Sequence, residues 1–341
     1  MSSTRNLSPW EHFVRSMRDV ETVDGCPVDD AAALPAWRER FRRRFESLLG
    51  PLPSPVALNA EVTASEDCGP YRRDHIVFDS ERHMSVPAFL MVPHERDAPG
   101  PAVLAQHGHG PGKDEVCGID GGDPERRAII DGLNGDYAHQ LALLGYVVLA
   151  PDLRTFGERR DIGPPDRYGC DLTHVHMSML GHNLLALDMW DLARAIDYLG
   201  SHPLVDSDRM GMVGLSQGGT MTLFMAAWDE RIKAAVVSGY FANWATSATI
   251  PWNMCGSQVL HGMLGQMEHV DLGALVAPRP LLIESGTADP IFPAPIAVHE
   301  WSRLAKVYAA LGAPDRLWFD PFEGGHRWNG VQAVKFLEKW L

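Results

Sequence analysis

A serine, an aspartate and a histidine stand at positions in this chain where they could perform nucleophilic catalysis. Ser216 lies in the pentapeptide Gly-Leu-Ser-Gln-Gly at 214–218, between a short apolar run and a run with helical spacing. A serine in a sharp strand-to-helix turn exposes its hydroxyl, and glycines flank it because larger side chains would collide with the strand and helix. The helix start also aims backbone N–H groups at an oxyanion formed beside the serine. The pattern predicts a nucleophile elbow.

A serine hydroxyl is a weak nucleophile unless a base takes its proton and a third group orients that base. Asp289 stands in a tight loop after an apolar run, and His326 lies on a glycine-flanked loop after the last such run. We therefore predict a catalytic triad of Ser216, Asp289 and His326. Asp320 and Glu323 are alternatives for the acid, but they share the segment of His326 and would have to fold back to reach its Nδ1. Glu284 is a third alternative, but the pattern places it within the strand that precedes Asp289.

The negative charge that develops on a tetrahedral intermediate needs two N–H donors held in place. The backbone of Gln217, the residue after the serine, is expected to supply one. The loop at 106–112 is rich in histidine and glycine, and we choose the backbone of His109 as the second donor.

These side chains need a scaffold that joins distant segments. Runs at 75–78 and 86–92 read as an antiparallel pair of strands, and beyond them apolar runs alternate with helical patterns. Further strands are expected at 102–105, 146–150, 209–213, 234–237, 280–283 and 316–319, with helices at 137–144, 183–199 and from about 330. This order predicts an α/β fold with a doubly wound, mostly parallel sheet of about eight strands. The predicted site falls at the carboxyl ends of the strands.

The first 70 residues differ from the rest. They hold two amphipathic patterns, at 9–20 and 31–49, and the segment is too small for a core of its own. We expect residues 1–70 to form an N-terminal helical appendage and residues 71–341 the catalytic domain, with a cap at 241–271. That cap carries Phe241, Trp244, Trp252 and Met254, which could shape an apolar substrate pocket or only pack on the core.

Composition excludes several kinds of partner. The net charge of −14 argues against nucleic acid and anionic membrane surfaces, which need clustered Lys and Arg. The five cysteines show no C-x-x-C spacing, so neither a disulfide framework nor structural zinc is expected. The first residues lack a signal-peptide core and no stretch has the length of a membrane span. We expect a cytoplasmic protein that can form homo-oligomers.

The sequence offers one candidate metal site, formed by His174 and His176 with His182 nearby. Residues at i and i+2 share a face only in an extended segment, and no further cysteine or carboxylate spacing supports a site. We expect no metal and no cofactor.

From about residue 72 to its end, the chain resembles the α/β-hydrolase superfamily and, within it, the branch of dienelactone hydrolases and acetyl xylan esterases. The resemblance rests on the segments 106–110, 152–159, 208–219 and 286–293. It implies the α/β-hydrolase fold, with the triad and oxyanion hole named above.

Dienelactone hydrolases use a cysteine nucleophile, whereas this chain has Ser216. The serine favours a carboxylesterase that acts on a small-molecule ester through an acyl-enzyme. A deacetylase of acetylated carbohydrates or small molecules is one such enzyme. Two alternatives stay open: a serine hydrolase that cleaves amide or C–C bonds, and a non-catalytic interaction protein that keeps the fold.

Overall fold

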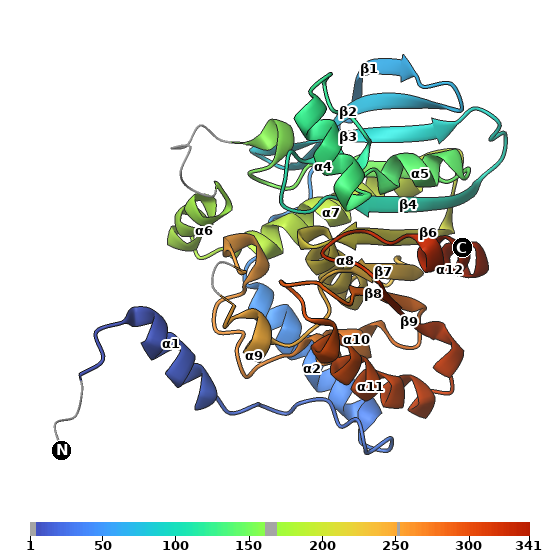
Figure 1. Ribbon diagram of the computed structural model, residues 1–341. Coiled ribbons are helices and arrows are strands. Elements are labelled where there is room, and N and C mark those ends of the chain that lie inside the picture. The colour runs from blue at the N-terminus through green and yellow to red at the C-terminus, as the bar shows by residue number, and fades with distance from the viewer. Residues whose placement is uncertain (1–4, 161–168, 251–252) are drawn as a thin grey trace.

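A nine-stranded sheet runs through the centre of the computed structural model, which describes residues 5–160, 169–250 and 253–341 (Figure 1). In chain order its strands are β1 (Glu61–Asp67), β2 (Tyr71–Glu81), β3 (Met84–Pro93), β4 (Gly100–Gln106), β5 (Val147–Pro151), β6 (Val205–Leu215), β7 (Ala234–Ser238), β8 (Leu281–Gly286) and β9 (Leu317–Phe322). In the sheet they lie in the order β1-β2-β3-β5-β4-β6-β7-β8-β9. The prediction of a mostly parallel, doubly wound α/β sheet is confirmed, with nine strands in place of about eight.

The direction of pairing changes along the sheet. β1, β2, β3 and β5 pair antiparallel, whereas β5, β4, β6, β7, β8 and β9 pair parallel. β4 lies between β5 and β6, both of which follow it in the chain, so the strand order reverses at β4. Ligands of open α/β sheets bind at such a switch point, beyond the carboxyl ends of the strands. The loops after β4 and β6 meet there.

Twelve helices are present in the described part of the chain. They are α1 (Pro9–Arg18), α2 (Leu34–Leu49), α3 (Lys113–Val116), α4 (Pro124–Leu133), α5 (Tyr137–Leu143), α6 (Gly169–Met179), α7 (Leu184–Ser201), α8 (Gln217–Trp228), α9 (Trp244–Ser247), α10 (His269–Val276), α11 (Ala294–Ala310) and α12 (Val331–Trp340). None of the described helices has the length and apolar character needed to cross a bilayer.

The helices cover both faces of the sheet. Alternate residues of a strand point to opposite faces, so Ala102 and Leu104 of β4 join the larger core with α2, α7, α8, α10 and α11. Val103 and Ala105 join the smaller core with α5 and α12. Because both faces are covered, the parallel strands are continuous apolar runs, as the sequence indicated.

Two elements of the first 70 residues pack on the rest of the chain. α2 buries Leu34, Trp37, Phe41, Phe45 and Leu49 along one face, and these residues are part of the larger core. β1 is the edge strand of the sheet, although only helices were expected before residue 71. Every residue of β1 is exposed and the strand carries no apolar stripe, so the pattern gave no sign of it. The division into an appendage and a catalytic domain stays a prediction.

Candidate active site

Ser216 stands in a strained turn between β6 and α8. Its backbone has φ 61° and ψ −119°, a conformation that residues other than glycine rarely adopt. The Ser216 N–H donates to Ser238 O at 3.0 Å and its carbonyl accepts from Thr220 N at 2.9 Å. The turn is thus fixed on one side by the end of β7 and on the other by the first turn of α8.

Close backbone contacts explain the glycines around the serine. A Cβ at Gly218 would lie 2.0 Å from Gln106 O, at the end of β4. A Cβ at Gly214 would lie 2.3 Å from Gly218 O, and one at Gly219 would lie 2.7 Å from Ser238 O. A side chain at any of these positions would push the turn off the sheet, so the glycines are required by main-chain packing.

The predicted acid and base form a direct hydrogen bond. His326 Nδ1 lies 2.8 Å from Asp289 Oδ2, and the aspartate side chain is 1% exposed. The other oxygen, Oδ1, accepts from the N–H groups of Ile291 and Phe292 at 2.8 and 3.0 Å. His326 Nε2 is buried without a hydrogen-bond partner among the described residues. The second nitrogen of the ring is therefore available to another group.

The His326 ring lies beside the serine turn. A Cβ added to Gly239, the residue after β7, would lie 3.0 Å from His326 Cε1 and 3.0 Å from Leu215 Cδ1. The imidazole and the residue before Ser216 therefore contact the same point of the backbone. The structure brings Ser216, Asp289 and His326 to one edge of the sheet, beyond β6, β8 and β9.

The other carboxylates considered for the acid have different surroundings. Asp320 accepts from Asn329 Nδ2 at 2.8 Å, and Glu323 is exposed. Glu284 is fully buried and accepts from Gly330 N at 2.9 Å, and its burial raises its pKa to about 7. Asp289 is the carboxylate that hydrogen-bonds to His326.

The loop after β4 lies against the turn that carries the serine. A Cβ at Gly108 would lie 3.0 Å from Leu215 O and 3.4 Å from Ser216 Cβ. His107 braces this loop, because its Nε2 accepts from Leu153 N at 3.0 Å and its Nδ1 donates to Gly108 O at 2.8 Å. Burial lowers the pKa of His107 and keeps the ring neutral for both bonds. This positioning role was missed in the sequence, where its only sign was the histidine-glycine pair.

Gln217 is the first residue of α8, so its N–H has no partner within the helix. Its side chain donates to Ser257 O at 2.9 Å. The oxyanion-hole role of the Gln217 and His109 N–H groups stays a prediction.

Comparison with known proteins finds relatives among hydrolases. A family model described as BAAT / Acyl-CoA thioester hydrolase C terminal matches residues 188–268. The "Putative hydrolase YtaP" of Bacillus subtilis (strain 168) is 30% identical over 330 residues, which span 89% of this chain and 100% of that protein. The chain belongs to the same hydrolase family as YtaP. The mouse "Acyl-coenzyme A thioesterase 1" is 29% identical over 188 residues, 54% of this hydrolase and 37% of the thioesterase.

Solved structures share the fold of the hydrolase at lower sequence identity. A "putative acetyl xylan esterase" from Bacteroides fragilis superposes with a TM-score of 0.80 at 19% identity, over 94% of this chain and 84% of that one. A glucuronoyl esterase from Solibacter usitatus gives a TM-score of 0.66 at 18% identity, over 88% and 91%. The fold is the α/β-hydrolase fold.

The histidines considered as metal ligands are not aligned in the structure. His174 and His176 are on helix α6, so the extended segment that would align them is absent. The His174 ring lies 5.3 Å from that of His261, and His182 Nδ1 bonds to Pro51 O at 2.9 Å.

Most of the predicted cap residues are placed by the structure. Phe241 and Trp244 are buried in the larger core, where Trp244 Nε1 donates to Met267 O at 2.8 Å and its ring lies 4.2 Å from that of His269. They hold the segment after β7 on the core, as expected for the alternative in which these side chains only pack on the core. Trp252 lies outside the described residues, and a substrate role for any of the set stays a prediction.

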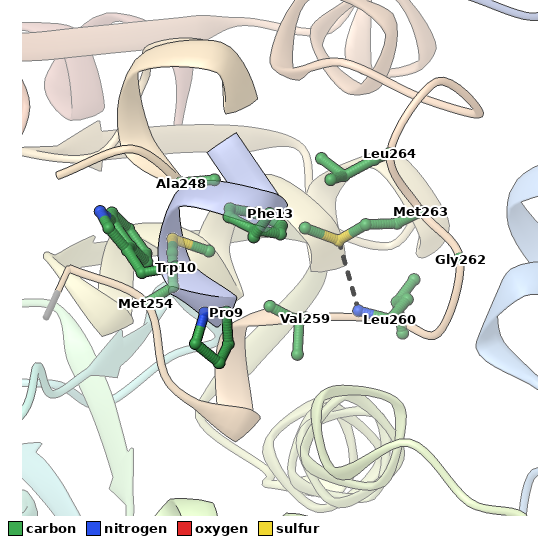
Figure 2. A pocket seen from close by; sticks show the side chains of 10 residues that line it. All are labelled: Pro9, Trp10, Phe13, Ala248, Met254, Val259, Leu260, Gly262, Met263 and Leu264. Atoms are coloured by element: carbon green, nitrogen blue, oxygen red, sulfur yellow. Dashed lines mark hydrogen bonds between the residues drawn. The ribbon is translucent and has the colours of Figure 1, made fainter. Parts of the chain in front are cut away.

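Met254 lines an apolar cavity of about 620 Å³ between α1 on one side and Ala248 with residues 254–264 on the other (Figure 2). Trp10 and Phe13 of α1 form one wall and Met263 contributes to the other, while none of the predicted triad residues lines the cavity. No residue of α1 is buried, and Trp10 is 45% exposed. The cavity is therefore walled on one side by a helix that lies on the outside of the molecule (Figure 1).

Proposed function

We propose that the hydrolase is a serine carboxylesterase that cleaves small-molecule esters through an acyl-enzyme. The observation that carries the proposal is the Asp289–His326 pair, because the His326 ring lies beside the strained turn of Ser216 and its Nε2 has no hydrogen-bond partner among the described residues. A base, its orienting carboxylate and an elbow serine on one edge of the sheet are the parts that acyl transfer requires.

The first half of the reaction makes the acyl-enzyme. His326 Nε2 takes the proton of Ser216 Oγ as this oxygen attacks the ester carbonyl carbon. The resulting oxyanion accepts hydrogen bonds from the N–H groups of Gln217 and His109. When the tetrahedral intermediate collapses, the C–O bond to the alcohol breaks, and the imidazolium of His326 protonates the departing oxygen.

In the second half, water replaces the alcohol. His326 takes a proton from water, whose oxygen attacks the acyl carbon. Collapse then breaks the bond from the acyl carbon to Ser216 Oγ, which regains its proton from the His326 imidazolium, and the carboxylic acid is released. Asp289 holds the ring throughout, because its Oδ2 accepts a hydrogen bond from the Nδ1–H group, which keeps that proton on Nδ1 and leaves the Nε2 lone pair to act as the base. The two backbone bonds to Oδ1 keep the carboxylate in that orientation.

A thioester is a second candidate for the bond that is cleaved. The match to the acyl-CoA thioester hydrolase model runs from α7 through the serine turn and ends at the residue before α10. The same triad would act on both bonds, and only the leaving atom differs. Acetyl esters of carbohydrates are favoured among oxygen esters by the likeness to the acetyl xylan esterase fold.

Replacing Ser216 by alanine tests the proposal. We expect Ser216→Ala to lose roughly 10⁶-fold in kcat, the scale of loss when a triad nucleophile is removed. Hydrolysis of acetyl, longer-chain and aromatic nitrophenyl esters and of an acetyl thioester is measured in parallel. A fluorophosphonate should label the wild type at Ser216 by peptide mass spectrometry.

Ser302→Ala, on the exposed face of α11, is the matched control and should keep full activity and labelling. Retention of more than a few per cent of activity by a folded Ser216→Ala variant would show that another residue is the nucleophile.

A further inference from the structure

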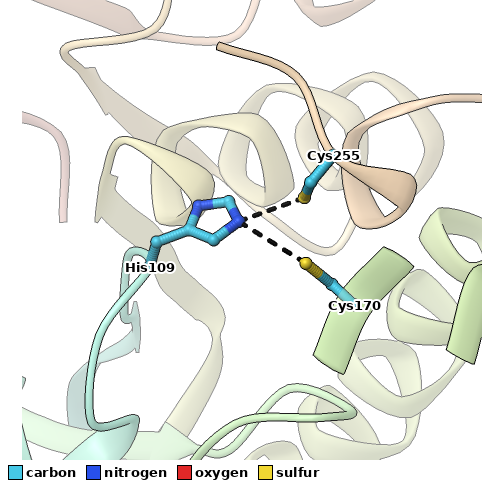
Figure 3. A group of neighbouring side chains, drawn as sticks. All are labelled: His109, Cys170 and Cys255. Atoms are coloured by element: carbon cyan, nitrogen blue, oxygen red, sulfur yellow. Dashed lines mark hydrogen bonds between the residues drawn. The ribbon is translucent and has the colours of Figure 1, made fainter. Parts of the chain in front are cut away.

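Three soft ligands from separate segments meet next to the loop after β4 (Figure 3). His109 comes from that loop, Cys170 from the first turn of α6, and Cys255 from the residue before the turn at Gly256–Gln258. The ligand atoms of all three side chains lie within 4.8 Å of one another. The cluster was missed in the sequence because 61 residues separate His109 from Cys170 and 146 separate it from Cys255.

The distances suit a small cation. His109 Nε2 lies 3.0 Å from Cys255 Sγ and 4.0 Å from Cys170 Sγ, and Figure 3 shows both sulfurs facing this nitrogen. Zinc binds sulfur at about 2.3 Å and nitrogen at about 2.0 Å, so a tetrahedral site separates N and S by about 3.5 Å. That separation lies between the two observed distances, and a shift of about half an ångström in each would bring both sulfurs to it.

The donor set has a defined chemical preference. Thiolates and imidazole are soft and borderline ligands that favour zinc over calcium or magnesium. Neither sulfur is committed to a disulfide, because Cys170 and Cys255 are free thiols. Ser257 Oγ lies 3.0 Å from Cys255 Sγ, which supplies the outer hydrogen bond that usually supports a metal-bound thiolate.

The segments that carry the ligands are already tightly packed. A Cβ at Gly256 would lie 2.2 Å from His174 Cβ on α6, and Gly256 N donates to Asp171 Oδ1 at 2.9 Å. Cys170 and Cys255 are thereby held next to each other without the metal. A preformed site of this kind costs little conformational entropy when the ion binds.

We propose that His109, Cys170 and Cys255 bind one zinc ion through two thiolates and one imidazole, with the fourth position open as far as the described residues go. Two thiolates, one histidine and one open position is a known zinc coordination set. The ion would tie α6 and the segment after residue 252 to the loop after β4. The binding of zinc does not depend on the proposed function. An effect of zinc on turnover does depend on it, because the backbone of His109 is also the expected oxyanion donor.

Cobalt(II) serves as a spectroscopic probe of the zinc site. The full-length protein is purified without a metal-binding tag, kept reduced with a phosphine and freed of metal by a chelator. One equivalent of cobalt should give thiolate-to-cobalt charge-transfer bands and the intense visible bands of a tetrahedral ion. One equivalent of zinc should bleach them. Cys170→Ser and Cys255→Ser should each weaken binding by more than about 100-fold, beyond the cost of losing an outer-shell partner.

Two control variants show whether cobalt binding is specific to the cluster. Cys68→Ser removes a half-buried free thiol outside the cluster and should bind cobalt as the wild type does. Ser216→Ala should also bind cobalt normally, so failure of the proposed function leaves this test intact. Circular dichroism confirms that each variant is folded. If one of the two cysteine variants does not fold, the other still tests the proposal.

A wild-type protein without charge-transfer bands, or with the affinity of the folded cysteine variants, would overturn the proposal. A Cys170–Cys255 disulfide that persists in the reduced preparation would overturn it as well.

Discussion

At the scale of single residues, one hydrogen bond decides which nitrogen of His326 can act as a base. With Nδ1 donating to Asp289 Oδ2 at 2.8 Å, the lone pair stays on Nε2, which is buried and has no partner in the described chain. An asparagine at 289 could present its NH₂ group to Nδ1 and so hold the opposite tautomer. The proton would then sit on Nε2, where a base is needed.

We therefore expect Asp289→Asn to lower kcat on the order of 10⁴-fold while the protein stays folded. Asp320→Asn is the matched control, because Asp320 bonds to Asn329 and its loss should leave kcat within a few-fold of wild type. Initial rates with a nitrophenyl ester and thermal unfolding of both variants provide the measurement. If Asp320→Asn were the more damaging change, the acid would be assigned wrongly.

The residues that sequence reasoning located are those with local signals. Ser216, Asp289 and His326 each follow an apolar strand and stand among glycines or a proline, so the pattern alone placed them at strand ends. His107 and Cys255 carry no such signal, because their partners lie far away in the chain. Their roles depend on tertiary packing, which no local pattern encodes.

At the scale of elements, α2 shows how the first 70 residues are attached. Phe41 is fully buried between Trp37 and Phe45, with ring centroids at 5.0 and 6.4 Å. Phe45 in turn lies 5.9 Å from Phe224 of α8, the helix that begins after Ser216. The aromatic face of α2 is therefore part of the packing that holds α8 in place.

Phe41→Ala should lower the free energy of unfolding by about 3–5 kcal/mol, the cost of removing a buried phenylalanine side chain. Phe13→Ala on α1, where the ring is 36% exposed, is the control and should cost less than about 1 kcal/mol. Urea unfolding followed by tryptophan fluorescence measures both. Equal effects of the two substitutions would mean that α2 does not share the cooperative core.

Elements were predictable where hydrophobic periodicity is strong. The parallel strands and α7 appear where apolar runs indicated them, because burial on both sheet faces demands such runs. β1 escaped because it is an exposed edge strand, ordered by hydrogen bonds to β2. The candidate metal site required an extended segment around His174 and His176. Their segment is helix α6 instead, and its helical form separates the two histidines.

At the scale of the whole molecule, a chain of net charge −14 keeps several carboxyl groups inside. Burial raises the pKa of Glu115, Glu268 and Glu284 to about 7 and that of Asp271 to about 6. A carboxyl whose pKa is raised in the folded state stabilises the fold fully below its unfolded pKa. That contribution is lost as the pH rises through the folded pKa. Between about pH 4.5 and 7 these groups therefore reduce stability as the pH increases.

Replacing one of them should flatten that dependence. In Glu284→Gln the amide oxygen can still accept from Gly330 N, but no charge appears at higher pH. Between pH 4.5 and 8 we expect the variant to lose about 3 kcal/mol less stability than the wild type, since a pKa unit is worth about 1.4 kcal/mol. Urea unfolding across this range measures the difference, with exposed Glu323→Gln as control. Parallel profiles for Glu284→Gln and wild type would show that Glu284 is not held neutral.

The contact between Gly218 and Gln106 has an evolutionary consequence. Main-chain atoms of β4, β7 and α8 fix the serine turn, and these contacts require that side chains be absent at 214, 218 and 219. Many of the side chains around Ser216 can therefore be substituted without moving the nucleophile. This tolerance is consistent with a fold retained at a TM-score of 0.80 and 19% identity. Divergence in such a lineage should accumulate in the segments that meet the substrate, while the turn beneath them changes last.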